Sequence, residues 1–118
     1  MSDYQEEQPL REEIDALAGP AVLAFGTNWC GYCRVADRFV EPALADHPEV
    51  PLLQVEDGRG RRLGRSFRVK LWPTLIFLRD GTEVARVVRP ASRAPLDAAL
   101  ARLLTPSPDD GASAIDVE

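Results

Sequence analysis

The sequence contains two cysteines, Cys30 and Cys33, with two residues between them. Two cysteines at this spacing lie one turn apart at the start of a helix, where their sulfurs can close a small disulfide. The amino end of a helix carries free N–H groups and a positive dipole, and both favour the thiolate of the first cysteine. We therefore expect Cys30 to be an exposed nucleophile and Cys33, one turn deeper, to be the resolving thiol. In disulfide exchange one thiolate attacks the substrate, and a second displaces the substrate from the mixed disulfide.

Other chemistry of a cysteine pair fits this sequence less well. A zinc site needs about four nitrogen or sulfur ligands, and besides the pair the sequence offers only His47. Two cysteines per chain supply an iron–sulfur cluster only at an interface between two chains. A structural disulfide or two ordinary core thiols stay open as alternatives, although a domain of this size forms a core without cross-links. The sequence therefore predicts no metal site and no bound cofactor.

The cysteine pair lies where a strand is expected to be followed by a helix. Residues 20–25 form a short apolar run, typical of a central strand buried on both faces, and residues 26–28 follow as a loop. A helix is expected from Cys30 to about His47, with a kink at Pro42. Its predicted apolar stripe contains Val35, Ala36, Phe39, Val40, Ala43 and Leu44, and its polar side contains Arg34, Asp37, Arg38 and Glu41.

The remaining elements indicate an α/β fold. A helix is expected from Pro9 to Gly19, with apolar positions at Leu10, Ile14, Leu17 and Ala18. A short helix follows within 59–68, and a last helix starts near Ser92. Asp80-Gly81 is a hairpin signal. Three further strands are predicted at 52–56, 74–78 and 83–88. This order predicts a central mixed four-stranded sheet with helices on both faces.

The length of 118 residues and the 28% of charged residues are typical of one soluble domain. We expect a flexible N-terminus over 1–8, the domain over 9–104, and a disordered tail over 105–118 that carries four acids and no base. The acidic N-terminus does not resemble a secretory signal, and no apolar run is long enough to cross a bilayer. We therefore expect a reducing cytoplasm and no membrane partner. A cysteine pair there is typically catalytic, redox-sensing or metal-binding.

A basic segment is the other feature that carries chemistry. Nucleic-acid binding by such a segment needs interleaved aromatic side chains on which bases stack, and these are missing here. We predict a solvated helix face and no nucleic-acid partner. The segment contains Arg59, Arg61, Arg62, Arg65, Arg68 and Lys70.

Two segments resemble the thioredoxin superfamily. The stretch 25–34 reads Phe-Gly-Thr-Asn-Trp-Cys-Gly-Tyr-Cys-Arg, and it is similar to the active-site segment of that family, where the motif is typically Trp-Cys-Gly-Pro-Cys-Lys. The stretch 69–74, Val-Lys-Leu-Trp-Pro-Thr, resembles the family's cis-proline loop, which packs beside the cysteine pair and contacts substrate backbone. The resemblance covers roughly residues 10 to 104. It implies a thioredoxin-like fold and a cis Trp72–Pro73 bond that leaves backbone groups of Trp72 free to face Cys30.

The resemblance also implies a function. It implies a thiol–disulfide oxidoreductase that reduces protein disulfides through Cys30 and Cys33. We expect it to act as a monomer and to take electrons from an unidentified donor, such as a thioredoxin-reductase-like enzyme. Two alternatives stay open: a thioredoxin-fold adaptor with weak redox activity, and an oxidant or isomerase of protein disulfides in an oxidising compartment. Supporting or substrate-binding positions implied by the resemblance are Trp29, Gly31, Tyr32, Trp72, Pro73 and Thr74.

One departure from the family pattern concerns proton transfer. Ala24 stands where family members usually have a buried acid that helps to deprotonate the resolving cysteine, and Gln54 is the only polar residue where the usual partner lysine is found. We therefore expect the pKa of Cys33 to be near or above the free value of about 8.5, raised further by burial. Turnover should then be slow at pH 7 and rise steeply towards pH 8.5. Water or Glu56 are the first candidates for the missing acceptor.

Three further departures concern the surroundings of the pair. Tyr32 replaces the usual proline between the cysteines, so the redox potential cannot be transferred from the family. The usual glycine after the last strand is replaced near Arg89-Pro90, which should alter the substrate groove. The family's extra first strand has no counterpart before Pro9, so residues 51–56 are expected to form a sheet edge.

Overall fold

A central strand, β1 (Pro20–Gly26), organises the sheet. It pairs in parallel with β2 (Leu52–Glu56) and antiparallel with β3 (Thr74–Arg79), and β3 pairs antiparallel with β4 (Thr82–Val88). The strand order is therefore β2-β1-β3-β4 in the computed structural model, which describes residues 4–105. This is the mixed four-stranded sheet that the sequence predicts.

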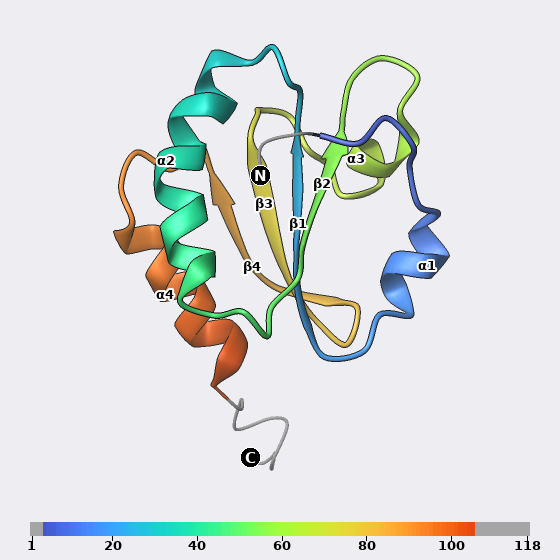
Figure 1. Cartoon of the computed structure of the whole chain (residues 1–118). Helices are drawn as coiled ribbons and strands as arrows, with labels where there is room; N and C mark the ends of the chain where they lie inside the picture. Colours follow the sequence, from blue (N-terminus) through green and yellow to red (C-terminus); the bar gives the residue numbers. More distant parts are fainter. Residues whose placement is uncertain (1–3, 106–118) are drawn as a thin grey trace.

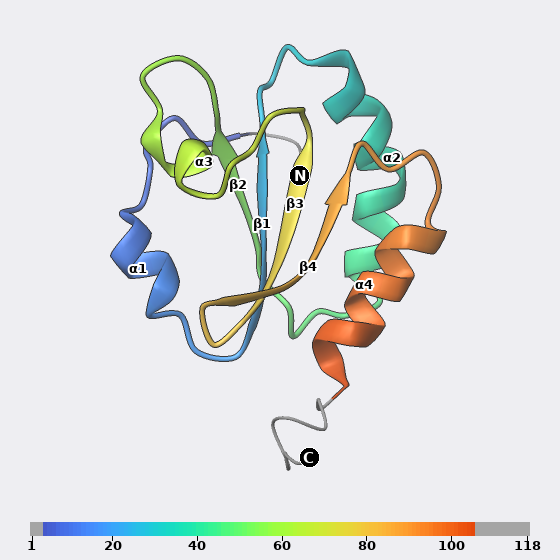
Figure 2. The ribbon, with the colours of Figure 1, turned by 180° about the vertical axis from the view of Figure 1, so that it is seen from behind.

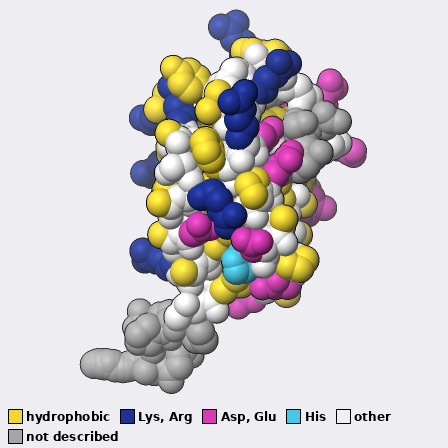
Figure 3. Space-filling view, turned by 60° about the vertical axis from the view of Figure 1, so that its left-hand side comes forward, with side chains coloured by type: hydrophobic (Ala, Val, Ile, Leu, Met, Phe, Trp, Pro, Cys, Tyr) yellow, Lys and Arg dark blue, Asp and Glu magenta, His cyan; other side chains and the backbone are white. Residues whose placement is uncertain are grey.

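Helices cover both faces of this sheet, as Figure 1 and Figure 2 show from opposite sides. α2 (Gly31–Ala45) and α4 (Ala94–Leu104) lie on one face, and the shorter α1 (Arg11–Asp15) and α3 (Arg62–Ser66) lie on the other. Acidic, basic and hydrophobic side chains are interspersed on the face that comes forward in Figure 3. The element order and the two covered faces confirm the predicted α/β architecture.

β1 is buried along almost its whole length because a hydrophobic core lies on each side of it. Val22 and Ala24 belong to the core under α2 and α4, whereas Leu23 and Phe25 belong to the core under α1 and α3. Successive strand residues point to opposite faces, so both sets are buried at once. The strand therefore ends in a rigid position, and the cysteine segment follows directly after it.

α2 carries its second cysteine into the core beneath it. Pro42 lies inside the helix, as predicted, and does not end it. Val35 was expected in the apolar stripe but is 46% exposed, because its position falls outside the row of buried side chains. That row recurs at intervals of three and four residues: Cys33, Ala36, Val40 and Ala43.

The first helix is shorter than predicted. It spans only Arg11–Asp15, and Ile14 is its only buried side chain. The backbone N–H of Leu10 donates to the Glu13 side chain at 2.8 Å, which places Leu10 at the helix start with its own side chain exposed. A local capping interaction therefore decides where this helix begins, and the apolar residue at Leu10 does not extend it.

The N-terminal segment is packed where the sequence predicts a frayed end. Gln5 forms a parallel bridge with Val55, through hydrogen bonds of 2.9 Å from Gln5 N–H to Gln54 O and from Glu56 N–H to Gln5 O. The Tyr4 side chain is 4% exposed. β2 is the edge strand of the sheet, as predicted, and the bridge from Gln5 covers part of that edge. Tyr4 and Gln5, which the sequence predicts to be frayed, are packed at this place. Backbone pairing needs no side-chain periodicity, so the sequence pattern does not reveal it.

The remaining elements differ from prediction only at their ends. The hairpin between β3 and β4 turns at Asp80 and Gly81, whose φ angles of 52° and 79° suit a two-residue turn. α4 begins at Ala94, two residues after the predicted Ser92. Within residues 4–105 no helix is long and apolar enough to cross a membrane. The predicted acidic tail lies, except for Thr105, outside the described residues.

Candidate active site

The two cysteines lie at the start of α2, next to the carboxyl end of β1. Cys30 is the N-cap residue, and its sulfur accepts a hydrogen bond from the Cys33 backbone N–H at 3.2 Å. Both residues are free thiols. The sequence predicts an exposed Cys30, but the structure buries both side chains and leaves Cys30 7% and Cys33 1% exposed. Cys30 is therefore the more accessible residue of the pair, and its sulfur receives the hydrogen bond that the helix end offers an anion.

Cys33 is strongly held in its protonated form. Burial raises the pKa of its thiol to about 12, and hydrogen bonding and charge at Cys30 act in the same direction. The backbone of Thr27 and a hydrogen bond with the Tyr4 side chain lower the pKa of Cys33, but less strongly. The neighbouring strand residue Ala24 offers no carboxylate. The raised pKa agrees with the value expected from the sequence.

Gly26 provides the space in which Cys33 and Tyr4 meet. A Cβ atom at Gly26 would lie 2.5 Å from the Cys33 sulfur and 3.0 Å from the Tyr4 hydroxyl oxygen. Contacts this short are not tolerated, so only glycine fits at this position of β1. The Cys33 sulfur and the Tyr4 phenol therefore both pack against the backbone of Gly26.

The surface in front of Cys30 is aromatic. Trp29 and Tyr32, on either side of Cys30 in the chain, are 73% and 58% exposed. The Trp29 ring meets the Trp72 ring edge to face, with ring centres 5.7 Å apart and an angle of 79° between the planes. The Trp72 indole N–H donates to the Asp57 carboxylate at 2.9 Å. This hydrogen bond holds Trp72 beside Trp29.

Arg89 follows β4 and adds a cation beside the loop that precedes β3. The Trp72–Pro73 bond is cis. Arg89 donates from its backbone N–H to the Pro73 carbonyl at 2.9 Å and from Nε to the Trp72 carbonyl at 2.8 Å. The carbonyl of Trp72 is therefore occupied, which corrects the expectation of free backbone groups at Trp72 for the carbonyl.

Arg89 occupies a backbone conformation that favours glycine. Its φ angle is 49°, in the left-handed region that side chains rarely adopt. Its guanidinium lies 3.9 Å from the centre of the Tyr32 ring, so the cation covers one face of that ring. The sequence predicts that the replacement of glycine near Arg89 alters the substrate groove, and the Arg89 side chain lies at this place against Tyr32. We call Trp29, Tyr32, Trp72 and Arg89 the front surface.

Gly31 and Thr74, two supporting positions that the resemblance implies, lie apart from the front surface. Gly31 is exposed, and a Cβ atom there would meet nothing within 4 Å. Thr74 is 1% exposed, and its hydroxyl donates to the Leu71 carbonyl at 2.6 Å. Thr74 therefore shapes the loop from within and does not reach the surface.

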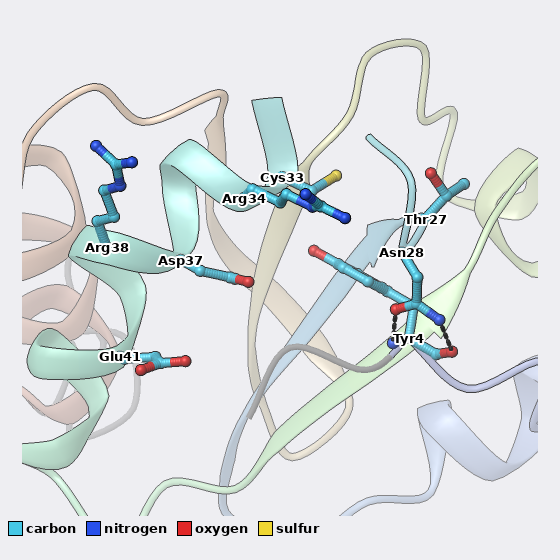
Figure 4. A pocket seen from close by; sticks show the side chains of 8 residues that line it. All are labelled: Tyr4, Thr27, Asn28, Cys33, Arg34, Asp37, Arg38 and Glu41. Atoms are coloured by element: carbon cyan, nitrogen blue, oxygen red, sulfur yellow. Dashed lines mark hydrogen bonds between the residues drawn. The ribbon is translucent and has the colours of Figure 1, made fainter. Parts of the chain in front are cut away.

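A pocket of about 580 Å³ opens on the other side of Cys33 (Figure 4). Asn28 holds the N-terminal segment at its edge, because its side chain accepts from Tyr4 N–H at 2.7 Å and donates to Tyr4 O at 3.4 Å. Burial, and then the charge of Glu41, raise the pKa of Asp37 to about 6. We call this the rear pocket, and it is lined by Tyr4, Thr27, Asn28, Cys33, Arg34, Asp37, Arg38 and Glu41.

Sequence reasoning did not single out Tyr4 or Asp37. Tyr4 is an aromatic residue within a polar stretch, and that contrast is a weak signal of burial. Asp37 follows Cys33 by four residues, which places both on one face of a helix. Glu56, suggested from the sequence as a proton acceptor, lies 3.5 Å from the Arg61 guanidinium and does not line the rear pocket. In the described part of the chain, no group of His, Cys, Asp and Glu side chains is arranged to hold a metal ion.

A mixed sheet with helices on both faces and a Cys-x-x-Cys pair at the start of a helix define a thioredoxin-fold thiol–disulfide oxidoreductase. The family model for thioredoxin matches residues 3–102, and the chain belongs to the thioredoxin family. Members of this family are disulfide reductases.

Solved structures and other relatives support the same assignment. Thioredoxin 2 from Pseudomonas aeruginosa PAO1, in its reduced form, is 57% identical with a TM-score of 0.78, over 86% of this chain and 94% of that chain. Fasciola hepatica thioredoxin is 29% identical with a TM-score of 0.62, over 78% of this chain and 86% of that chain. A thioredoxin of Chlamydia pneumoniae is 34% identical over 79 residues, which are 65% of this chain and 78% of the relative.

Proposed function

We propose that this chain reduces disulfides of other proteins in a reducing cytoplasm, with Cys30 as the attacking thiol and Cys33 as the resolving thiol. Electrons would return from a thioredoxin-reductase-like enzyme, and the chain would act as a monomer. The observation that carries the assignment of roles is the position of Cys30 at the N-cap of α2, where its sulfur accepts the Cys33 backbone N–H.

The proposed cycle has two exchange steps. The Cys30 thiolate attacks one sulfur of the substrate disulfide, so that a bond forms between Cys30 and the substrate and the second substrate sulfur leaves as a thiolate. Cys33 then loses its proton and attacks the Cys30 sulfur. The Cys30–Cys33 disulfide forms, the bond to the substrate breaks, and the substrate leaves with both sulfurs reduced. Two electrons pass from the dithiol to the substrate.

The front surface supports protein disulfides as substrates. Trp29 and Tyr32 present exposed aromatic rings next to Cys30, and such rings bind extended peptide segments through large apolar contacts. Arg89 lies against Tyr32 and adds a positive charge at the same place. A peptide that carries a disulfide can therefore contact this surface while its sulfur meets Cys30.

Alkylation and insulin reduction test this proposal. Iodoacetamide at pH 7 should label Cys30 of the reduced protein much faster than Cys33, as measured by peptide mass spectrometry over time. Insulin should be reduced catalytically with dithiothreitol as electron donor, and the Cys30→Ser variant should show no turnover. Equal labelling rates, or faster labelling of Cys33, would remove the assigned roles. Absence of insulin reduction by the wild type would favour the adaptor alternative.

A further inference from the structure

The resolving step has no carboxylate directly under the cysteine pair. Cys33 must lose its proton before it attacks Cys30, and its buried environment opposes that loss. Ala24 is 2% exposed and packs in the same core as Cys33, so the position beneath the pair is apolar. A proton acceptor has to reach Cys33 from another direction, and the rear pocket is the hollow that Cys33 lines.

Tyr4 places a hydroxyl group next to the Cys33 sulfur in that pocket. The two atoms lie within 3.0 Å and 2.5 Å of one point, the Cβ position at Gly26, and the hydrogen bond between the two side chains lowers the pKa of Cys33. Burial, and then charge at Cys33 and Asp37, raise the pKa of the Tyr4 phenol far above its ordinary value. The phenol therefore stays protonated, so its hydroxyl can donate a hydrogen bond to the Cys33 thiolate.

Asp37 is the acceptor on the other side of Tyr4. It follows Cys33 by one turn on the same face of α2, and Figure 4 shows its carboxylate and the Tyr4 hydroxyl pointing toward one another. The Asp37 side chain is half-buried. The titratable and charged groups that face it across the rear pocket are Tyr4 from the N-terminal segment and Cys33, Arg34, Arg38 and Glu41 from α2.

We propose that Asp37 accepts the proton of Cys33 across the rear pocket during the resolving step, that the Tyr4 hydroxyl donates to the resulting thiolate, and that this pair replaces the buried acid missing at Ala24. The proposal rests on the proposed function, in which Cys33 is the resolving thiol. Tyr4 touches the reacting sulfur, whereas Asp37 reaches it across the rear pocket.

The step balances as follows. Cys33 S–H gives its proton to the Asp37 carboxylate through solvent in the rear pocket, while Tyr4 O–H donates a hydrogen bond to the sulfur as it becomes a thiolate. The Cys33 sulfur forms its bond to Cys30 as the bond between Cys30 and the substrate breaks. The substrate sulfur leaves as a thiolate and takes a proton from solvent, and Asp37 later returns its proton to solvent through the pocket. Tyr4 ends the step as it began, as a neutral phenol.

The other groups near Cys33 are poorer acceptors. Arg34 and Arg38 carry no basic site at neutral pH. Glu41 lies one turn beyond Asp37, farther from the sulfur along α2. Asp37 combines proximity with a pKa of about 6, close to the pH of the reaction, which is the condition for an efficient general base.

A two-phase reaction separates the resolving step from the attack of Cys30. Reduced protein is mixed in a stopped-flow instrument with one equivalent of 5,5′-dithiobis(2-nitrobenzoate). Attack by Cys30 releases the first thionitrobenzoate, and attack by Cys33 on the mixed disulfide releases the second. The rate of the second phase is measured from pH 5 to pH 9.

The wild type should show a second phase that rises through pH 6 and is level at pH 7 to 8, because Asp37 accepts a proton only when ionised. Asp37→Asn should slow this phase at pH 7 by about tenfold or more, and its rate should instead rise with pH up to pH 9. Tyr4→Phe retains the ring but removes the hydroxyl, and it should slow the second phase similarly.

Glu12→Gln is the matched control, because it also removes one negative charge but lies on exposed α1, behind the opposite face of the sheet. Both of its phases should match the wild type, and the first phase of Asp37→Asn should stay within twofold. A second phase in Asp37→Asn that keeps the wild-type rate and the rise near pH 6 would overturn the proposal. Wild-type rates in Tyr4→Phe would overturn the role of Tyr4. Loss of the first phase in the wild type would instead overturn the proposed function.

Discussion

The two sides of the cysteine pair differ in chemistry and in burial. The front surface presents exposed aromatic rings at Trp29 and Tyr32 beside Cys30. The rear pocket places buried or half-buried ionisable groups, Tyr4 and Asp37, beside Cys33. The front surface matches the pattern of the family apart from Tyr32 and Arg89, whereas the rear pocket departs from it at the position of the buried acid.

This difference indicates that the two exchange steps depend on separate parts of the molecule. Substrate capture requires an exposed surface around the nucleophile, which many peptides can contact. Resolution requires a protected place where a thiol proton can leave. A change of residue on one side can therefore be compensated on that same side, as Asp37 and Tyr4 compensate for Ala24 in our proposal.

Serine substitutions of the two cysteines should give the largest effects and should differ in kind. Cys30→Ser and Cys33→Ser each remove a reacting sulfur, so each should lower insulin reduction by about 10³-fold or more. Only Cys33→Ser should accumulate a mixed disulfide with substrate, because attack remains and resolution is lost. Mass spectrometry under non-reducing conditions measures the adduct. An adduct that forms on Cys30→Ser instead would show that Cys33 attacks the substrate and that Cys30 is the resolving thiol.

A carboxylate returned to the position beneath the pair should restore the resolving step. In the Asp37→Asn background, Ala24→Asp should speed the second stopped-flow phase at pH 7 by about tenfold, because the new acid lies in the core that contains Cys33. Ala24→Asn is the matched control, since it has the same shape without an ionisable group. Equal rescue by both substitutions would attribute the gain to packing and not to proton transfer.

Gly26→Ala should disturb the rear pocket alone. The new Cβ would lie 2.5 Å from the Cys33 sulfur, and overpacking of this kind costs about 1–3 kcal/mol of the free energy of unfolding. Gly31→Ala is the control, because a Cβ there meets nothing within 4 Å, and its stability should stay within about 0.5 kcal/mol of the wild type. Urea unfolding measures both variants. A larger loss at Gly31 would show that the front of the pair is the more tightly packed side.

The fold and the front surface were largely predictable because their signals are local. The apolar run of β1, the turn at Asp80-Gly81 and the cysteine spacing each determine a short piece of structure by themselves. The same holds for the segment around Trp72. Among the predicted helices and strands the errors lie mainly at the ends, such as the start of α1, where one capping hydrogen bond from Leu10 to Glu13 decides the boundary.

The rear pocket was not predictable because it depends on long-range backbone pairing. Tyr4 reaches Cys33 only because Gln5 pairs with β2 and Asn28 binds the Tyr4 backbone. Neither interaction leaves a periodic pattern of side chains. The sequence places Asp37 on the polar side of α2, and its side chain is half-buried there. Asp37 has a role in proton transfer in our proposal because it lines the rear pocket together with Tyr4 and Cys33. Tyr4 is distant from Asp37 in sequence, so the pattern of α2 alone does not reveal this role.

Asp37→Asn should also make the protein more stable at neutral pH. Burial raises the pKa of Asp37 from 3.8 to about 6, so the folded state binds this proton more tightly than the unfolded state. The stability that comes from the neutral form is present below pH 4 and is lost as pH rises through 6. Because the side chain is only half-buried, solvent screening reduces the cost of ionisation to about 1 kcal/mol.

Urea unfolding at two pH values measures this effect. The variant should be more stable than the wild type at pH 7 and equal to it at pH 4. A gain in stability together with a slower resolving step would show that the loss of rate does not come from unfolding. A variant less stable than the wild type at both pH values would mean that Asp37 has a structural role, and the rear pocket would then resemble an ordinary packed surface.

The smallest effect is expected within the front surface, at the contact between Arg89 and Tyr32. The guanidinium lies 3.9 Å from the ring centre, and an exposed cation–π contact contributes about 0.5–1 kcal/mol. A double-mutant cycle with Arg89→Met and Tyr32→Leu should give a favourable coupling energy of that size in urea unfolding. The pH profile of the second stopped-flow phase should be unchanged in all three variants, because neither side chain lines the rear pocket. A shift of the rise near pH 6 in Arg89→Met would instead show that charge at the front surface reaches Asp37, and the two sides of the pair would then be electrostatically coupled.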